Sequence, residues 1–189
     1  MDDGQMVSSI LKELGGVLRH SGEAAKVLTQ EVADAAKRGS QVMLFGVGRE
    51  GLMMKGFAMR LFHLGLRVSC IFDMTTPPIS SNDLLVLSAG PGSFSTVEAL
   101  ASIARSANAR VLLLTAQPSG PASRLADVVA HVPAQTMASD TSPSPSSLLP
   151  MGSLYEGALF ILFEIVVLKL KDALGVSSES MRARHTNLE

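Results

Sequence analysis

The sequence predicts an α/β fold in which one domain holds a parallel sheet of five strands with helices on both faces. Short apolar runs typical of buried parallel strands alternate with longer segments of helical periodicity. Strands that alternate with helices form right-handed βαβ units, whose strands lie parallel in one sheet. A chain of 189 residues, 47% of them hydrophobic, suffices for one such domain and is too short for two ordinary ones. We therefore expect residues 1–189 to form a single domain.

Residues 1–38 are predicted to form N-terminal helices that precede the sheet. Ser21-Gly22 marks the break between two helices and provides a new N-cap. The apolar residues at helical spacing are Val7, Ile10, Leu11, Leu14 and Leu18 in the first group, and Val27, Leu28, Val32, Ala35 and Ala36 in the second. Gly39-Ser40 ends this part of the chain.

The remaining elements alternate along the chain. The predicted strands are 41–46, 68–72, 84–88, 111–115 and 128–132. The predicted helices are 52–64, closed by Gly65 as a C-cap, then 97–107 and 153–175. Residues 137–150 are rich in serine and proline and are predicted to form a mobile loop. Residues 176–189 are predicted to form a short charged tail.

Composition excludes several classes of function. Lys and Arg total 16 and Asp and Glu total 17, so the net charge of -1 gives no electrostatic footprint for nucleic acid or an anionic membrane. Glu156 and Glu164 interrupt the apolar run 154–170, which is predicted to be a buried helix and not a membrane span. The acidic N-terminus lacks the apolar segment of a signal peptide, so we expect a cytoplasmic protein.

Two further features concern partners and metals. The mean hydropathy of +0.30 is high for a chain of this size and indicates apolar surface that another copy of the chain would cover. Cys70 is the single cysteine, and no two of the four histidines have ligand spacing. The sequence therefore predicts no disulfide framework and no metal site, with Cys70 as a small buried hydrophobic residue.

Two glycine-rich loops are the candidate ligand-binding segments. In an open α/β sheet, ligands bind where the carboxyl ends of strands lead into helix N-termini. The first loop, 46–51, follows the first strand, and the second loop, 88–96, follows the third. Both present backbone N–H groups and a positive helix end to an anion such as a phosphate. The candidate binding residues are Gly48, Arg49, Glu50, Ser88, Gly90, Gly92, Ser93, Ser95 and Thr96.

The first loop also matches the dinucleotide-binding pattern G-x-G-x-x-G. Asp73 stands at the end of the next strand, about 20 residues on, where that pattern places an acidic residue. Against this interpretation, Arg49 and Glu50 are charged where small residues usually let a pyrophosphate approach. A strand-to-helix turn that binds no ligand is a further alternative, and the residues alone leave these interpretations open.

Glu156 is the candidate catalytic carboxylate. It lies in the first turns of a helix that is otherwise almost wholly apolar. Either it pairs with a neighbour at the helix N-terminus, or it lies in a dry site where desolvation raises its pKa. A raised pKa suits proton abstraction next to a carbonyl near neutral pH. Taken alone, His63 is expected to cap a helix, and His185 matters only if the polar tail folds onto a site of its own or a neighbouring subunit.

Motifs across nearly the whole chain resemble sugar isomerase (SIS) domains, and more narrowly the 6-phospho-3-hexuloisomerase group. The resemblance lies in residues 46–65, 75–79, 82–88, 150–159 and 182–189. Several separated motifs in the same order are more specific than one glycine loop. The resemblance implies a flavodoxin-like sheet that binds phosphosugars, which disfavours the dinucleotide interpretation.

The resemblance also implies an activity and a set of roles. It implies a phosphosugar isomerase that needs no metal or redox cofactor and interconverts 3-hexulose 6-phosphate and fructose 6-phosphate through an enediol. Glu156 would be the base, and Arg49 would contact the sugar or stabilise developing charge. His63 and His185 would serve ring opening or contact sugar oxygens. Proteins of this kind are commonly homotetramers whose sites borrow residues across subunits.

The second loop departs from the family pattern. SIS domains usually carry Ser-Gly-Ser-Gly-Glu-Thr here, whereas this chain has Ala89-Gly-Pro-Gly-Ser-Phe94. Pro91 removes an amide donor, and each charge-assisted hydrogen bond lost is worth about 1.5–3 kcal/mol. Ser88, Ser93, Ser95 and Thr96 compensate only if the loop changes register. The alternative function is therefore a non-catalytic SIS protein that binds a phosphosugar or only assembles.

Overall fold

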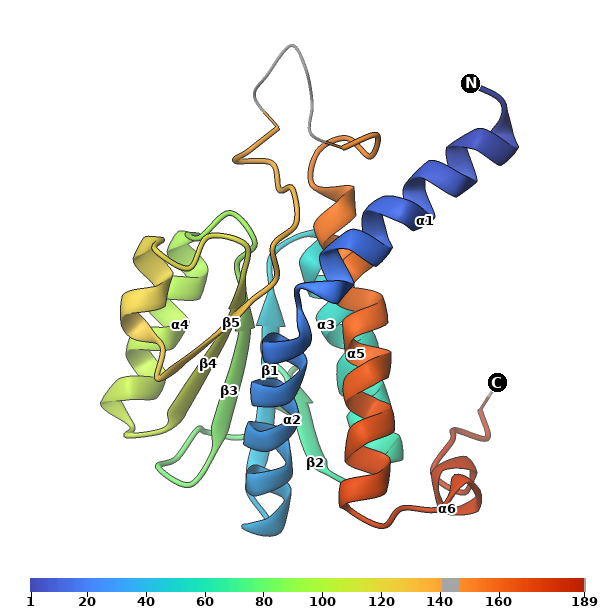
Figure 1. The fold of residues 1–189 in the computed structure, drawn as a ribbon. Helices are drawn as coiled ribbons and strands as arrows, with labels where there is room; N and C mark the ends of the chain where they lie inside the picture. The colour runs from blue at the N-terminus through green and yellow to red at the C-terminus, as the bar shows by residue number, and fades with distance from the viewer. Residues whose placement is uncertain (141–146, 189) are drawn as a thin grey trace.

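A parallel sheet of five strands forms the centre of the computed structural model, which describes residues 1–140 and 147–188 (Figure 1). The strand order is β2-β1-β3-β4-β5. The strands are β1 (Gln41–Gly46), β2 (Arg67–Cys70), β3 (Leu84–Ser88), β4 (Arg110–Thr115) and β5 (Val128–His131). This order confirms the predicted flavodoxin-like sheet, because the dinucleotide-binding order would place a further strand beyond β2.

The order of the strands reverses between β1 and β3, so a crevice opens at their carboxyl ends. The register aligns these ends, because Ser88 pairs with Gly46 of β1 on one side and with Leu114 of β4 on the other. Both glycine loops therefore leave the sheet at the same level and from adjacent strands. The fold thus brings together the two segments that the sequence singled out for ligand binding.

Helices cover both faces of the sheet, as predicted (Figure 1). The helices are α1 (Asp3–Arg19), α2 (Gly22–Lys37), α3 (Arg49–His63), α4 (Ser95–Ser106), α5 (Ser153–Ala173) and α6 (Ser178–Arg182), with the 3-10 helix η1 (Pro121–Leu125). One face packs against α2, α3 and α5, and the other against α4 and η1. Successive side chains point to opposite faces, so Val42 and Leu44 enter the first core and Met43 the second.

The helices that border the crevice are fastened to each other by aromatic packing. Phe57 of α3 stacks on Phe163 of α5, with ring centroids 4.3 Å apart and planes 9° from parallel. Both rings are buried. α5 is buried along most of its length, as predicted, and packs against α2, α3 and α1. Within the described residues, no helix has the length and apolar character needed to cross a membrane.

Several predicted boundaries shift for local reasons. α3 begins at Arg49 and not at residue 52, because Gly48 with φ 59° and ψ -129° turns the chain directly into the helix. β2 ends at Cys70, two residues earlier than predicted, and Phe72 beyond it has a φ of 74°. Cys70 is half-buried and not buried, since β2 is an edge strand.

The two terminal segments differ in how they join the domain. The break at Ser21-Gly22 is confirmed, and α1 packs on α5 while its first turns project away from the sheet (Figure 1). The predicted charged tail contains α6, which packs against α3. Within the predicted loop 137–150, residues 141–146 lie outside the described part of the chain.

Candidate active site

A cavity of about 520 Å³ lies at the carboxyl edge of the sheet, where the N-termini of α3 and α5 meet. Its lining comes from both glycine loops, from the segment after β5 and from the first turns of α5. The lining residues are Val47, Gly48, Arg49, Glu50, Pro91, Phe94, Thr136, Met137, Met151, Gly152, Tyr155 and Glu156. Two helix N-termini face one cavity, so its field favours an anionic ligand.

Arg49 joins the first loop to the start of α5. Its guanidinium lies 3.1 Å from the Glu156 carboxylate and donates a hydrogen bond of 2.7 Å to the Ser153 hydroxyl. It also donates to the Met151 carbonyl. One side chain therefore holds the N-terminus of α5 and its carboxylate against the first loop.

The Glu156 carboxyl combines the two environments considered from sequence. It pairs with Arg49, and its side chain is only 16% exposed. Burial raises its pKa above the ordinary value, while the Arg49 charge opposes that rise. A carboxyl group with a raised pKa beside a fixed positive charge has the properties that a general base at a carbon acid needs.

Glu50 forms a second, deeper carboxyl site in the same cavity. It is 6% exposed and accepts hydrogen bonds from the Ser88 hydroxyl at 2.5 Å and the Gly90 amide at 3.0 Å. Burial raises its pKa, these two hydrogen bonds oppose the rise, and the Glu156 charge adds to it. Glu50 and Ser88 were predicted as substrate contacts, and in the structure they contact each other.

Tyr155 completes this buried group, and sequence reasoning did not identify it. Its hydroxyl lies 3.3 Å from the Ser88 hydroxyl, and the side chain is fully buried. Burial raises its pKa well above the ordinary value, and the nearby Glu50 charge adds to the effect. Two signals were present in the sequence, since Tyr155 is the one tyrosine of the chain and immediately precedes Glu156.

Gly90 lets the aromatic ring and the carboxylate pack against the second loop. A Cβ at this position would lie 2.9 Å from the Tyr155 ring and 3.1 Å from a Glu50 carboxylate oxygen. Gly90→Ala is therefore expected to lower the free energy of unfolding by about 1–3 kcal/mol, measured by urea denaturation. The control is Gly56→Ala on α3, where a Cβ meets nothing within 4 Å and alanine favours the helix. A Gly90→Ala protein as stable as Gly56→Ala would contradict this packing.

The second loop presents a mixed surface to the cavity. Pro91 and Phe94 line it, whereas Ser93 is exposed and donates its hydroxyl to Glu98. Ser95 and Thr96 begin α4 and are exposed, and Phe94 at the N-cap offers no side-chain acceptor to the first-turn amides. Those amides therefore remain available to an anion. Gly92 turns the loop at a φ of 91°.

His63 and His185 lie together, but at the other end of α3. Their rings stack with centroids 5.5 Å apart, and Arg184 donates to the His63 carbonyl at 3.1 Å. Burial lowers the His63 pKa, with Arg60 and His185 adding to the effect. α3 is roughly 20 Å long and carries Arg49 at its other end. Within one chain, the two histidines are therefore remote from Glu156, and their catalytic roles stay a prediction.

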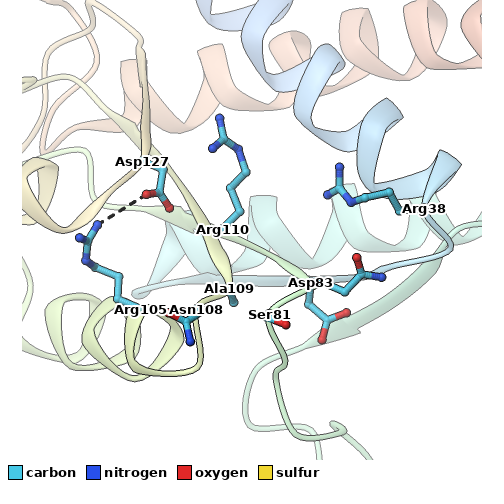
Figure 2. A pocket seen from close by; sticks show the side chains of 9 residues that line it. Arg38, Ser81, Asp83, Arg105, Asn108, Ala109, Arg110 and Asp127 are labelled. Carbon is cyan, nitrogen blue, oxygen red and sulfur yellow. Dashed lines mark ion pairs between the residues drawn. The ribbon is translucent and has the colours of Figure 1, made fainter.

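A second hollow, of about 510 Å³, lies at the opposite edge of the sheet (Figure 2). Its charged groups are mostly engaged with each other or with neighbouring residues. Arg105 pairs with Asp127 at 3.6 Å, and Arg110 binds Glu31 through two hydrogen bonds of 2.6 and 2.7 Å. Asp83 accepts from the Gln41 amide and from Ser80. The cavity at the carboxyl edge, with its helix ends and two carboxyl groups, is the better candidate for an active site.

Two ligands other than a phosphosugar were considered from the sequence, a dinucleotide and a metal ion. Asp73 does come near the first loop, because both border a smaller cavity of about 270 Å³ beside β2. In the part of the chain that the structure describes, no group of three or more His, Cys, Asp or Glu side chains is placed to hold a metal ion.

Comparison with known proteins addresses the family directly. The SIS domain family model matches residues 36–161. The chain is 33% identical over 190 residues to the 3-hexulose-6-phosphate isomerase of Bacillus subtilis (strain 168), with 100% of each chain covered. It is 40% identical over 169 residues to the 3-hexulose-6-phosphate isomerase of Mycobacterium gastri, covering 88% of this chain and 84% of the relative.

A solved structure shows the same fold. It is that of a hypothetical protein from Methanococcus jannaschii, described as inferring a 3-hexulose-6-phosphate isomerase function. The TM-score is 0.82 at 24% identity, with 98% of this chain and 99% of that chain covered. The flavodoxin-like strand order, the two glycine loops and the sequence matches agree, and the chain belongs to the SIS domain family.

Proposed function

We propose that this protein is a 3-hexulose-6-phosphate isomerase, which interconverts 3-hexulose 6-phosphate and fructose 6-phosphate. The observation that carries the proposal is the largely buried Glu156 carboxylate, which Arg49 holds at a cavity that two helix N-termini face. The relatives with this name at 33% and 40% identity support the same substrate. We also propose that residues 1–189 act as one unit, because α1 packs on α5 and α6 on α3.

The geometry suits an isomerisation through an enediol. Glu156 takes the proton from the carbon next to the sugar carbonyl and returns it to the adjacent carbon. Its raised pKa makes the carboxylate a stronger base, and the Arg49 charge keeps it ionised before the reaction. Arg49 also lies close enough to Glu156 to stabilise the negative charge that develops on the substrate oxygens.

The substrate phosphate is proposed to bind at the start of α4. Pro91 has no amide hydrogen, and the Gly90 amide is already bonded to Glu50, so the early part of the second loop offers few donors. The first turn of α4 supplies the amides and hydroxyls of Ser95 and Thr96, with the Ser93 hydroxyl nearby. Phe94 is the N-cap of α4 and also lines the cavity, so a phosphosugar would extend from α4 towards Glu156.

We propose a cytoplasmic homotetramer in which subunits complete one another's sites. Exposed apolar side chains on α3 and α5 support self-association, among them Leu52 (62% exposed), Phe62 (53%) and Phe160 (60%). His63 and His185 lie at the end of α3 that faces away from the chain's own cavity. A neighbouring subunit is therefore the proposed route by which they reach a substrate.

Removal of the tail tests this arrangement. Truncation after Leu174 is expected to lower kcat/KM by at least about tenfold because His185 is lost from the neighbour's site. The oligomer should persist, as measured by size-exclusion chromatography with light scattering, because the apolar faces of α3 and α5 remain. His185→Gln should reproduce the loss of activity without removing α6. Full activity in both variants would show that His185 has no role in the reaction.

A coupled assay tests the proposed function itself. Purified protein is supplied with 3-hexulose 6-phosphate, and fructose 6-phosphate formation is followed through a linked dehydrogenase. We expect turnover of about 1–10³ s⁻¹ and much poorer reaction of the unphosphorylated sugar. The altered second loop favours the alternative of a non-catalytic phosphosugar-binding protein. Folded protein that binds fructose 6-phosphate by calorimetry without turnover would establish that alternative.

A further inference from the structure

The cavity holds a second carboxyl group, Glu50. This group has no role in the reaction if Glu156 is the only acid–base residue. Glu50 lies on the first turn of α3 and lines the same cavity as Glu156. The two carboxyl groups are close enough for the charge of Glu156 to raise the pKa of Glu50. A buried carboxyl group at a ligand cavity is costly to keep unless it has a structural partner or a chemical role.

The proposed isomerisation moves two protons, one between carbons and one between oxygens. If one carboxylate moves only the proton between the two carbons, another group has to move the proton between the two oxygens. Among the cavity-lining residues, the Arg49 guanidinium is a donor only and is already bound to Glu156, Ser153 and Met151. Tyr155 is fully buried, and its pKa lies well above the ordinary value. Glu50 is the remaining carboxyl group on the cavity wall.

The surroundings of Glu50 support both of its charge states. The Ser88 hydroxyl and the Gly90 amide donate to the carboxylate and stabilise the ionised form. Burial and the Glu156 charge on α5 stabilise the neutral form. The charged and titratable groups around it are Glu156 and Tyr155 of α5 and Arg49 of α3, while β3 contributes only the neutral Ser88. A group balanced in this way can give up a proton and recover it within one cycle.

We propose that Glu50 is the acid–base group that serves the substrate oxygens while Glu156 serves the carbons, an inference that rests on the proposed isomerisation. Glu156 removes the proton from C2 as neutral Glu50 donates its proton to the carbonyl oxygen at C3, which forms the enediol. Ionised Glu50 then takes the proton from the oxygen at C2 while Glu156 returns its proton to C3. The carbonyl moves from C3 to C2, and both carboxyl groups regain their starting states.

The assignment predicts a separate kinetic signature for each carboxyl group. The reactive form has Glu156 ionised and Glu50 protonated, so activity falls at low pH through Glu156 and at high pH through Glu50. Glu50→Gln keeps an acceptor for the Gly90 amide and a polar partner for Ser88. It is expected to lower kcat by at least about 10²-fold, change KM by less than about threefold and remove the high-pH limb.

Two further variants separate chemistry from packing. Glu50→Asp keeps the acid one methylene shorter, and it should retain part of the activity together with the high-pH limb. Glu23→Gln on α2 is the matched control, because Glu23 is exposed and, within the described residues, forms an ion pair only with Lys26. A Glu50→Gln enzyme with wild-type kcat and an unchanged pH profile would overturn the proposal and leave Glu50 with a structural role.

Calorimetry distinguishes this proposal from the proposed function. Binding of fructose 6-phosphate is measured near neutral pH in two buffers of different ionisation enthalpy, which reports proton uptake. The comparison is repeated above the pH at which activity falls through Glu50, where Glu50 is ionised in the free protein. There the wild type should take up more protons than Glu50→Gln, and equal uptake would overturn the role of Glu50 as proton carrier. A wild type that binds fructose 6-phosphate with this extra uptake but shows no turnover would contradict the isomerase function, and it would leave Glu50 as a group that takes up a proton when the sugar phosphate binds.

Discussion

Glu156→Gln is expected to lower kcat for the isomerisation by at least about 10²-fold, with KM changed by less than about threefold. The amide keeps the size of the side chain but cannot accept the proton from carbon. Its oxygen still accepts from Arg49, so the arginine and the start of α5 should stay in place. The coupled assay with 3-hexulose 6-phosphate measures the loss, and circular dichroism checks that the variant is folded.

The pH dependence of kcat provides a second test of the role of Glu156. Burial raises the pKa of Glu156, and the reaction needs its ionised form, so wild-type activity should fall as the pH drops through that pKa. The residual activity of Glu156→Gln should lack this low-pH limb. Asp172→Asn, at an exposed position near the end of the same helix, is the control. It should keep wild-type activity and the low-pH limb of the profile. Turnover within about threefold of wild type in Glu156→Gln would remove Glu156 from the mechanism.

Phe57→Ala is expected to lower the free energy of unfolding by about 3–5 kcal/mol. The ring is 1% exposed and stacks on Phe163 at 4.3 Å, so its removal leaves a cavity between α3 and α5. A loss of this size is a large share of the roughly 5–15 kcal/mol that stabilises a typical domain. Urea denaturation measures it directly. Phe57→Leu fills most of the space and should lose less, and a Phe57→Ala loss below about 1 kcal/mol would show that the two helices do not depend on this stack.

The sequence was most informative where a local pattern determines structure. The runs 41–46 and 84–88 were predicted with the bounds that β1 and β3 have, because each is a continuous apolar segment buried on both faces. Glu156 stood out as a carboxylate in an apolar helix, and the structure places it at the cavity. The parallel order of the strands then brought both glycine loops to one edge.

The contacts that a local pattern does not determine were missed. The prediction that Glu50 binds the ligand did not include its hydrogen bond with Ser88, which lies 38 residues further along the chain. Tyr155 reads as one more apolar residue of α5 until the hydroxyl of Ser88 is placed beside it. Arg49 likewise reaches Ser153 across 104 residues. Each of these contacts depends on how the strands and helices pack, which the order of residues in one segment does not reveal.

The contact between Gly90 and Glu50 has a consequence for engineering this chain. A designer who transplants Ser-Gly-Ser-Gly-Glu-Thr into positions 89–94 would add donors to the second loop, yet the Gly90 amide would still be bonded to the carboxylate of Glu50. Replacing Glu50 alone would free that amide but leave Pro91 without a hydrogen to donate. The two changes are therefore expected to be strongly non-additive, as for residues in one hydrogen-bonded network. The two loops have to be exchanged as a matched pair.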